Sequence, residues 1–331
     1  MRKTNFGILG CGMVARIHAD ALQGIKEARL CGVADANPDS AAAFAQKYGI
    51  KAYASYEEML ADGEIDAVCI CTPSYLHASN AIAALSAGKH VALEKPMALS
   101  VAEADRVIDA CERAGKKLTV ISQLRFSEDI ARVKRLIADG AFGALTLCEL
   151  SMKQYRSEEY FASSNWKGRL AFEGGGALMN QGIHGVDLLL YLCGDATVVK
   201  GEIRTLSHKI EVEDTAAALL AFEGGALGVI TASTCAFPGF ERSIRIHGDK
   251  GFVFLNENRI EKMLTKDGET VDRKLRPLGS AADAAALDSR FHQKQLENLI
   301  GAIEGNEELL VGCRDGRAAI KLIGDIYGAK R

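Results

Sequence analysis

The most informative part of the chain is residues 6–15, which read Phe6-Gly7-Ile8-Leu9-Gly10-Cys11-Gly12-Met13-Val14-Ala15. An apolar run of strand length leads directly into two closely spaced glycines, and a helical pattern follows them. This order is what a dinucleotide-binding turn requires, because Gly10 and Gly12 permit a tight turn and a close approach of the backbone to a ligand. The N-terminus of the helix, at Met13 and Val14, can then hold a pyrophosphate.

An acidic residue strengthens this interpretation. Asp35 stands 25 residues after Gly10, at the end of the next predicted strand, residues 28–34. A carboxylate at that position can accept hydrogen bonds from the ribose hydroxyls of adenosine, and it repels a ribose 2′-phosphate. No arginine follows it immediately, so the sequence favours NAD, with NADP as the second candidate. The alternative is a glycine-rich turn without function and a surface aspartate.

The first 123 residues alternate between predicted strands and helices. Helix starts are marked by Asn37 before Pro38 and by Ser100 with Glu103 three residues later, a capping box. Alternation of this kind predicts βαβ units around a parallel sheet, and hence a dinucleotide-binding domain over residues 1–123. The predicted strands are residues 6–9, 28–34, 65–71, 90–93 and 117–122.

The remainder, residues 124–331, has one predicted helix at 127–139 and then longer alternating runs. These predict an α+β domain with an open, largely antiparallel sheet. The apolar stretch 215–233 approaches the length of a membrane span, but Glu223-Gly224-Gly225 divides it into the two strands of a hairpin. The predicted strands are residues 145–154, 198–206, 216–222, 226–234, 243–247 and 252–255. Helices near Gly176 and after Arg314 are expected on one face of the sheet, and residues 266–286 are expected to form a mobile loop.

The composition is that of a globular protein of roughly two domains, with 331 residues, 48% of them hydrophobic and 25% charged. Forty lysines and arginines against 43 acidic residues give a net charge of -3. That charge provides no field for holding nucleic acid or an anionic membrane. The apolar run at residues 6–11 is too short for a secretory leader. Nine cysteines without a C-x-x-C pair predict reduced thiols and a cytoplasmic location.

Polar residues follow two further predicted strands. Thr72, Pro73 and His77 come after the third strand, and Glu94 and Lys95 come after the fourth. The carboxyl ends of parallel strands form the edge at which open α/β sheets bind ligands. The alternatives are a surface lysine paired with its acidic neighbour and a structural histidine at the start of a helix.

Three glycines, residues 174–176, precede a predicted apolar helix that carries Asn180, His184 and Asp187. Spacings of four and three place these side chains on one helical face, and burying them without a partner would be costly. The imidazole of His184 is suited to take up a proton at cellular pH, and Asp187 could orient it. The alternative is a capped helix whose polar face points to solvent. The spacings of the histidines and cysteines match no zinc-binding pattern, so no metal site is predicted.

Together these motifs resemble the glucose–fructose oxidoreductase and inositol dehydrogenase family, also called Gfo/Idh/MocA. The resemblance spans nearly the whole chain, and the motifs that carry it are Gly10 to Ala15, Thr72-Pro73 with His77, Glu94-Lys95-Pro96, and the three glycines leading to His184 and Asp187. It implies an N-terminal Rossmann domain, a C-terminal open sheet and an active site between them. It also implies hydride transfer between a nicotinamide cofactor and a hydroxyl or carbonyl of a sugar, cyclitol or sugar derivative.

The resemblance assigns roles to individual residues. Lys95 looks like the family's active-site lysine and His184 like its catalytic histidine, while Trp166 and Lys167 look like residues that some members place near the nicotinamide. Many members carry an aspartate four residues before the histidine, where this chain has Asn180. An amide can position a hydroxyl but cannot take up its proton, so the base role falls on His184. The implied cofactor contacts are Gly10, Gly12, Met13, Val14, Asp35, Thr72, Pro73, His77, Glu94, Lys95, Trp166 and Lys167.

The expected reaction follows from these roles. His184, with Asp187 as a second partner, removes the hydroxyl proton while the carbinol hydride passes to NAD. Lys95 stabilises the developing alkoxide. The expected substrate contacts, from an adjoining loop, are Tyr155, Arg156 and Tyr160.

Two alternatives remain open. One is a reductase that works physiologically on a keto-sugar or an imine. The other is a non-catalytic regulatory protein that senses NAD(P), although the presence of both Lys95 and His184 argues against it. In either case, an open sheet with one apolar face predicts a homodimer or homotetramer.

Overall fold

The computed structural model describes residues 2–273 and 289–329. The chain divides into two compact units: the first comprises Met1–Gln123 and Leu287–Arg317, and the second comprises Leu124–Ala286 and Ala318–Arg331. The boundary expected from the sequence after residue 123 coincides with the change from the first unit to the second. The segment Leu287–Arg317, however, packs with the first unit, whereas the sequence-based division assigned it to the second domain.

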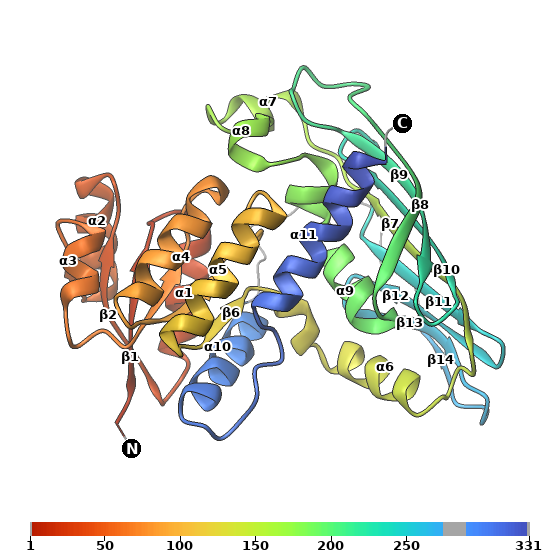
Figure 1. Ribbon diagram of the computed structural model, residues 1–331, viewed down its shortest axis with the longest axis horizontal. Coiled ribbons are helices and arrows are strands. Elements are labelled where there is room, and N and C mark those ends of the chain that lie inside the picture. The colour runs from red at the N-terminus through yellow and green to blue at the C-terminus, as the bar shows by residue number, and fades with distance from the viewer. Residues whose placement is uncertain (1, 274–288, 330–331) are drawn as a thin grey trace. The chain divides into compact units, whose positions relative to one another are not determined.

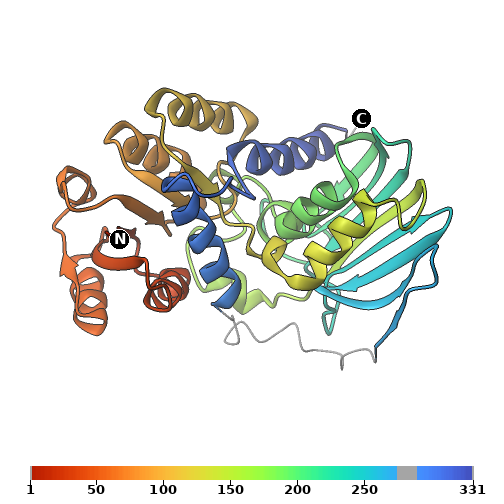
Figure 2. The same ribbon diagram turned by 90° about the horizontal axis from the view of Figure 1, so that it is seen from below.

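The first unit is built on a six-stranded parallel sheet with helices on both faces (Figure 1, Figure 2). Its strands are β1 (Thr4–Leu9), β2 (Ala28–Ala34), β3 (Lys51–Ala52), β4 (Ala67–Ile70), β5 (His90–Leu93) and β6 (Leu118–Val120). Its helices are α1 (Met13–Gln23), α2 (Pro38–Tyr48), α3 (Tyr56–Ala61), α4 (His77–Ser86), α5 (Val101–Ala114) and α10 (Arg290–Ile303). The strand order β3-β2-β1-β4-β5-β6 changes direction between β1 and β4, which is the Rossmann arrangement.

Local signals in the sequence explain these elements. Every residue of β1 and β4 is buried, as expected for strands covered on both faces. Asn37 caps α2 by accepting hydrogen bonds from two backbone N–H groups, and the Ser100 hydroxyl accepts one from the N–H of Glu103 at the start of α5. The five predicted strands and both predicted helix starts are confirmed. Strand β3 was not predicted, because its two exposed residues form no recognisable pattern.

Helix α10 is remote in sequence from the rest of the first unit, and it packs against α1. Its Gln295 is fully buried. The side-chain amide accepts a hydrogen bond of 3.1 Å from the N–H of Ser122 and donates one of 2.8 Å to the carbonyl of Val120. The C-terminal part of the chain therefore completes the edge of the parallel sheet next to β6.

The second unit is built on an eight-stranded sheet in the order β14-β13-β12-β11-β7-β10-β9-β8. The strands are β7 (Leu145–Lys153), β8 (Ala196–Arg204), β9 (Thr215–Phe222), β10 (Leu227–Ser233), β11 (Ser243–Gly248), β12 (Gly251–Asn256), β13 (Arg259–Leu264) and β14 (Thr270–Asp272). Among these described strands only β7 and β10 pair in parallel, and the other neighbours are antiparallel. The predicted open, largely antiparallel sheet and the β9–β10 hairpin are confirmed.

Two strands of this sheet escaped prediction. The register shifts between Phe254 and Leu255 where β12 pairs with β13, so β13 lacks a simple alternation of apolar and polar residues. Strand β14 lies within the stretch expected to be a loop, so that expectation is wrong for Thr270–Asp272. Residues 274–286 of the expected loop lie outside the described residues.

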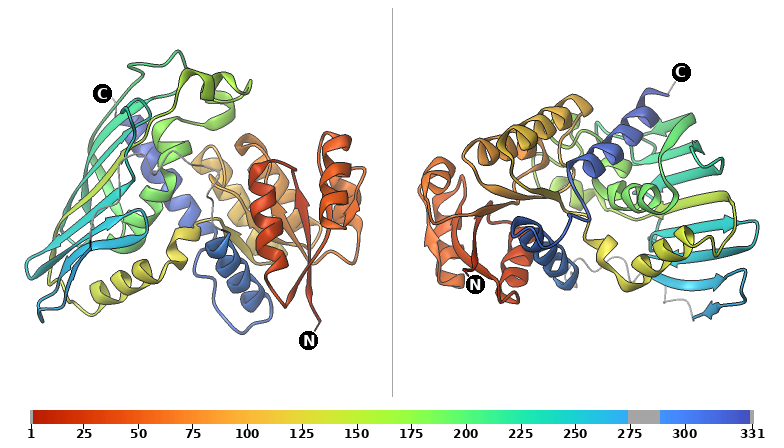
Figure 3. Two further views of the ribbon diagram at one scale, coloured as in Figure 1. Left: turned by 180° about the vertical axis from the view of Figure 1, so that it is seen from behind. Right: turned by 60° about the horizontal axis from the view of Figure 1, so that its bottom comes forward.

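Helices α6 (Glu128–Ala138) and α9 (Ile183–Cys193), with the C-terminal part of α11 (Cys313–Gly328), lie on one side of the eight-stranded sheet (Figure 1, Figure 3). Helix α9 approaches β7 closely, because a Cβ at Gly185 would lie 2.8 Å from Sδ of Met152 and 2.9 Å from Leu150. No described helix covers the opposite side. None of the helices within residues 2–273 and 289–329 has both the length and the apolar character needed to cross a membrane.

Candidate active site

The glycine turn of the first unit is built to approach a ligand. Gly10 has a φ of +95°, and a Cβ there would lie 2.8 Å from the carbonyl oxygen of Cys71, so only glycine fits. A Cβ at Gly12 would have no described atom within 4 Å. Helix α1 begins at Met13, and its first turn includes Val14. In the described structure no side chain caps this end of the helix, and the first turn contains no acidic residue. The backbone N–H groups of this turn are therefore available to an anion such as a pyrophosphate.

Asp35 is fixed beside this turn, at the end of β2. Its two carboxylate oxygens accept hydrogen bonds from the N–H of Cys11 at 2.7 Å and from the N–H of Asn37 at 2.8 Å. A carboxylate oxygen can accept more than one hydrogen bond, so Asp35 keeps acceptor capacity for ribose hydroxyls. Burial and the neighbouring Asp35 raise the pKa of the Cys11 thiol to about 12, so this cysteine stays protonated at neutral pH.

The loops after β4 and β5 are tied together by a buried histidine. The ring of His77, which is 1% exposed, has Nδ1 2.6 Å from the carbonyl oxygen of Pro96 and Nε2 2.8 Å from that of Thr72. Burial lowers the pKa of His77, although the two carbonyl oxygens act in the opposite direction. Both ring nitrogens face backbone carbonyls, so His77 holds in place the two loops that carry expected cofactor contacts. These contacts are Thr72 and Pro73 in one loop and Lys95 in the other.

Glu94 and Lys95 follow β5 directly, and Glu94 is buried while Lys95 is half-buried. The Glu94 carboxylate accepts hydrogen bonds from Nε2 of His18 at 2.9 Å and from the N–H of Lys95 at 3.2 Å. Nε2 of His292, from α10, lies 4.0 Å from the same carboxylate. His18, Glu94 and His292 each offer one atom that could bind a metal ion, and these three atoms lie within 4.8 Å of one another. In the described part of the chain this is the group with such a geometry.

In the second unit, the expected catalytic helix begins as a π-helix, η3 (Ala177–Gly182), and continues as α9. Within the fully described run 175–189, only Asn180, Gln181 and His184 are not buried. The carboxylate of Glu213 accepts hydrogen bonds of 2.8 Å from the N–H groups of residues 176 and 178, which fixes the start of the helix. Short π-helical turns are rare and occur frequently at functional sites. The helix therefore presents three polar side chains from an otherwise buried surface.

Asp187 does not share this exposure. It is 4% exposed, and Arg125, equally buried, donates to both of its oxygens at 2.9 and 2.6 Å. The guanidinium also stacks over the ring of Tyr191 at 4.5 Å. The sequence did not reveal Arg125 as a partner of Asp187, because the two residues are 62 positions apart. The structure thus places Asp187 in a buried ion pair that anchors α9.

A small hollow lies beside Asn180 and Gln181. Glu173, which is buried, lines the hollow and accepts a hydrogen bond from the side-chain amide of Asn180. The second buried carboxylate at the hollow is Glu213, whose pKa burial raises. Neither glutamate was expected from the sequence. The partners of Glu213 are more than 30 residues away, and the spacing of Glu173 and Asn180 matches no recognisable pattern. The other lining residues are Phe161, Gly176, Ala177, Ile210 and Thr234.

A cationic and aromatic cluster adjoins Gln181. The side-chain amide of Gln181 accepts a hydrogen bond from Arg156 at 2.9 Å and donates one to the Tyr160 hydroxyl at 3.0 Å. The charged groups of Arg156 and Lys167 lie 5.3 and 4.2 Å from the centre of the Tyr160 ring. Burial lowers the pKa of Lys167. Trp166 also lies near the ammonium of Lys167, at 5.7 Å. The structure thus groups four of the expected site residues.

Tyr155 adjoins this cluster through its backbone, because its carbonyl oxygen accepts a hydrogen bond of 3.0 Å from Arg156. Its ring is exposed and packs edge-on against Phe237, with ring centres 5.3 Å apart. Among the described hydrogen bonds and ring contacts, none joins the Tyr155 side chain to Gln181 or Tyr160.

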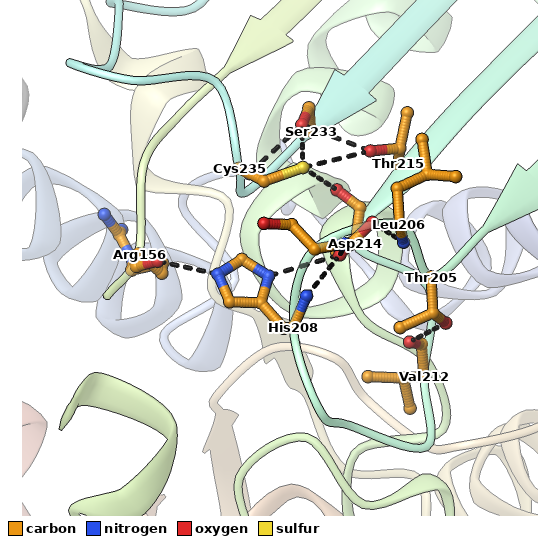
Figure 4. Close-up of polar contacts among 10 residues, drawn as sticks. Arg156, Thr205, Leu206, His208, Val212, Asp214, Thr215, Ser233 and Cys235 are labelled. Carbon is orange, nitrogen blue, oxygen red and sulfur yellow. Dashed lines mark hydrogen bonds and ion pairs between the residues drawn. The ribbon is translucent and has the colours of Figure 1, made fainter. Parts of the chain in front are cut away.

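The backbone of Arg156 is held by a loop after β8, as Figure 4 shows. Nε2 of His208 lies 2.8 Å from the carbonyl oxygen of Arg156, and Nδ1 lies 3.3 Å from the carboxylate of Asp214. The Asp214 carboxylate in turn accepts hydrogen bonds from three backbone N–H groups of the loop. Although burial opposes it, these hydrogen bonds lower the pKa of Asp214. A rigid support therefore fixes the segment that carries Arg156.

Comparison with known proteins agrees with these observations. A model described as "Oxidoreductase family, NAD-binding Rossmann fold" matches residues 4–122, and one for the GFO/IDH/MocA C-terminal domain matches residues 130–254. The solved WlbA dehydrogenase of Bordetella pertussis, in complex with NADH and UDP-GlcNAcA, has a TM-score of 0.88 and 33% identity, with 100% of this chain and 97% of that chain covered. A myo-inositol 2-dehydrogenase of Thermotoga maritima is 29% identical, with 98% of this chain and 95% of the relative covered. A levoglucosan dehydrogenase of Pseudarthrobacter phenanthrenivorans is 27% identical, with 83% and 79% covered.

The fold, the glycine turn and these matches define an NAD-binding oxidoreductase. The chain belongs to the Gfo/Idh/MocA family, as its motifs suggested. It is an NAD-dependent enzyme of the kind that transfers a hydride between nicotinamide and a hydroxyl or carbonyl carbon of a sugar, cyclitol or sugar derivative.

Proposed function

We propose that the chain oxidises a hydroxyl group of an acidic sugar derivative with NAD, and that Lys95 and His184 act on that hydroxyl. The observation that carries this proposal is the exposure of the helix at 175–189, where Asn180, Gln181 and His184 alone are not buried. An apolar helix that exposes an amide, a second amide and an imidazole offers donors and acceptors suited to a polyhydroxylated ring.

Each side chain has a distinct task in this proposal. His184 accepts the proton of the substrate hydroxyl, while the C–H bond of the carbon that bears this hydroxyl breaks. The Lys95 ammonium stabilises the negative charge that develops on the oxygen, and Asn180 orients the hydroxyl through its amide. NAD, when bound, supplies the acceptor for the hydride. The Asn180 amide is itself held by Glu173, so its orientation is fixed before substrate arrives.

The charge of the neighbouring cluster favours an acidic substrate. Arg156 and Lys167 both lie over the ring of Tyr160, and Arg156 also donates a hydrogen bond to Gln181, so a cation contacts the part of the helix that is not buried. Arginine suits a carboxylate or phosphate because its planar donors can bind both oxygens. The similar WlbA dehydrogenase was solved with UDP-GlcNAcA, a nucleotide-linked sugar acid, which supports the same class of substrate here. Neutral substrates, named for the inositol and levoglucosan dehydrogenases, are the second candidate.

The test is a turnover assay that follows reduced nicotinamide. UDP-GlcNAcA should be oxidised with a higher kcat/KM than its neutral counterpart UDP-GlcNAc, and Arg156→Ala should reduce that preference at least tenfold. Equal kcat/KM for the two sugars would reject the acidic substrate. Turnover of inositol or levoglucosan alone would support the second candidate. NAD binding without turnover of any member of the panel would support the regulatory alternative.

Variants of the proposed catalytic residues test the mechanism itself. Lys95→Ala should lower kcat by about 100-fold or more, because a preorganised charge at the developing oxyanion contributes about 3 kcal/mol. His184→Asn should have an effect of similar size. NAD binding should be unchanged in both, and Lys26→Ala, an exposed lysine of the first unit, is the matched control. Wild-type kcat in Lys95→Ala would remove that residue from the mechanism.

We also propose that the chain forms a homodimer or homotetramer through the open face of the eight-stranded sheet. Leu264, Leu147 and Leu227 stand in one row across the strands and are 41%, 37% and 52% exposed. Exposed apolar side chains gathered on one face of a sheet often mark an interface. Leu227→Lys should shift the mass measured by light scattering to that of a monomer, and an unchanged oligomer would place the interface elsewhere.

We further propose a cytoplasmic location. The support is that the sulfur atoms of all nine cysteines are free, which suits a reducing compartment. Fractionation of cells that express the tagged chain tests this, and recovery from an oxidising compartment would contradict it.

A further inference from the structure

Beneath the loop that carries Lys95 lies a buried charged cluster that the proposed mechanism does not use. It consists of His18 from α1, Glu94 at the end of β5, and His292 from α10, all of which belong to the first unit. His18 is 0% exposed, and its Nδ1 forms no hydrogen bond with any described residue. Buried ionisable groups are costly unless they are paired, so the position of this cluster requires an explanation.

The contacts show that the cluster is an ion pair centred on Glu94. The 2.9 Å contact makes His18 a donor to Glu94, and His292 lies within ion-pair distance at 4.0 Å. Burial opposes ionisation of Glu94, but the hydrogen bond from His18 and the charges of His18, His292 and Lys95 lower its pKa to about 2. Burial alone would lower the pKa of His18, yet its pKa is raised well above the ordinary value, in agreement with the Glu94 carboxylate 2.9 Å from its Nε2. At neutral pH the pair is therefore charged on both sides.

The second oxygen of Glu94 connects this pair to the neighbouring residue. It accepts a hydrogen bond of 3.2 Å from the backbone N–H of Lys95. On the other side of Lys95, the carbonyl of Pro96 is held at 2.6 Å by the ring of His77. The residues before and after Lys95 are thus each fixed by a fully buried histidine, so the backbone from which its side chain extends has little freedom.

We propose that His18 and His292 are positioning residues: they hold Glu94 in place, and Glu94 fixes the backbone of Lys95 so that its ammonium is aimed at the reacting oxygen. This inference rests on the proposed function, in which Lys95 is catalytic. A misplacement of about 1 Å can reduce turnover about 100-fold, so a support that is buried beneath the loop can control kcat without touching substrate.

The variants His18→Gln and Glu94→Gln test this idea. Glutamine at position 18 keeps an N–H donor but removes the positive charge, and glutamine at position 94 removes the negative charge at nearly constant volume. Both should lower kcat by about 100-fold, and His18→Gln should leave KM for the sugar and the affinity for NAD within about threefold. His90→Asn, at the opposite end of β5, keeps the acceptor for the N–H of Lys117 and is the matched control. A wild-type kcat in both glutamine variants would overturn the proposal.

A double-mutant cycle separates positioning from a general structural role. If His18 acts through Lys95, His18→Gln should lower kcat about 100-fold in the wild-type chain but less than twofold in the Lys95→Ala chain. Equal losses in the two backgrounds would overturn the proposal. Wild-type kcat in Lys95→Ala would instead refute the proposed function, so the two failures are distinguishable. Circular dichroism confirms folding, and if His18→Gln does not fold, His292→Gln enters the same cycle with the same criteria.

Discussion

The buried ion pair between Arg125 and Asp187 makes a sharp prediction for Asp187→Asn. Both side chains are about 4–5% exposed, and two hydrogen bonds of 2.9 and 2.6 Å join them. Breaking such a pair by removing one charge costs about 3–5 kcal/mol, because the other charge is left buried without compensation. Asparagine keeps one oxygen as an acceptor, so the lower end, about 3 kcal/mol, is expected. This is a large part of the usual stability of a domain.

The measurement is urea unfolding at neutral pH, followed by the fluorescence of Trp166. It is the single tryptophan of the chain and lies in the second unit, together with the ion pair. Replacing both partners, Arg125→Met with Asp187→Leu, is the control and should recover most of the lost free energy, because an apolar pair needs no charge compensation. A loss below about 1 kcal/mol in Asp187→Asn would refute this interpretation of the pair.

Three further perturbations follow from the first unit. Gly12→Ala should weaken NADH binding at least tenfold and leave the melting temperature of the cofactor-free protein unchanged. Gly10→Ala should weaken binding and also lower the melting temperature, since its Cβ would lie 2.8 Å from a carbonyl oxygen. Equal melting temperatures of the two variants would contradict this. Asp35→Ser should shift the ratio of kcat/KM for NAD over NADP toward NADP by at least tenfold, because a carboxylate repels the 2′-phosphate, and an unchanged ratio would remove Asp35 from cofactor selection. The pKa of Glu94 falls from 4.5 to about 2 on folding, so its contribution is present above pH 4.5 and is lost as the pH falls toward 2. At about 1.4 kcal/mol per unit this amounts to about 3 kcal/mol, and Glu94→Gln should remove that part of the acid dependence of the unfolding free energy.

The sequence predicted the Rossmann unit well because its signals are local. Strands β1, β2 and β5 are short apolar runs, and the caps at Asn37 and Ser100 depend on neighbours three residues away or fewer. The glycine turn and Asp35 also needed only the order of one strand, one helix and the next strand. The hairpin β9–β10 was predictable for the same reason, since Glu223 to Gly225 interrupt one apolar stretch.

The parts that escaped prediction depend on partners distant in the chain. The ion pair between Arg125 and Asp187 joins residues 62 positions apart, so only the folded chain shows it. The π-helical turn before α9 changes the helical periodicity on which the predicted polar face relied. His18 offered one signal that was not used: a histidine on the apolar face of a helix, between Ile17 and Ala19, needs a polar partner. The partner itself, Glu94, could not be identified from spacing.

The origin of α10 has a consequence for biosynthesis. A ribosome releases the chain from its N-terminus, so six strands of the parallel sheet emerge long before Gln295 is available to satisfy the backbone at the end of β6. The nucleotide-binding half is therefore finished only after the sheet of the second unit has been translated. A gene fragment that stops at residue 123 encodes an incomplete module, and an excised version needs the 287–317 segment joined to it.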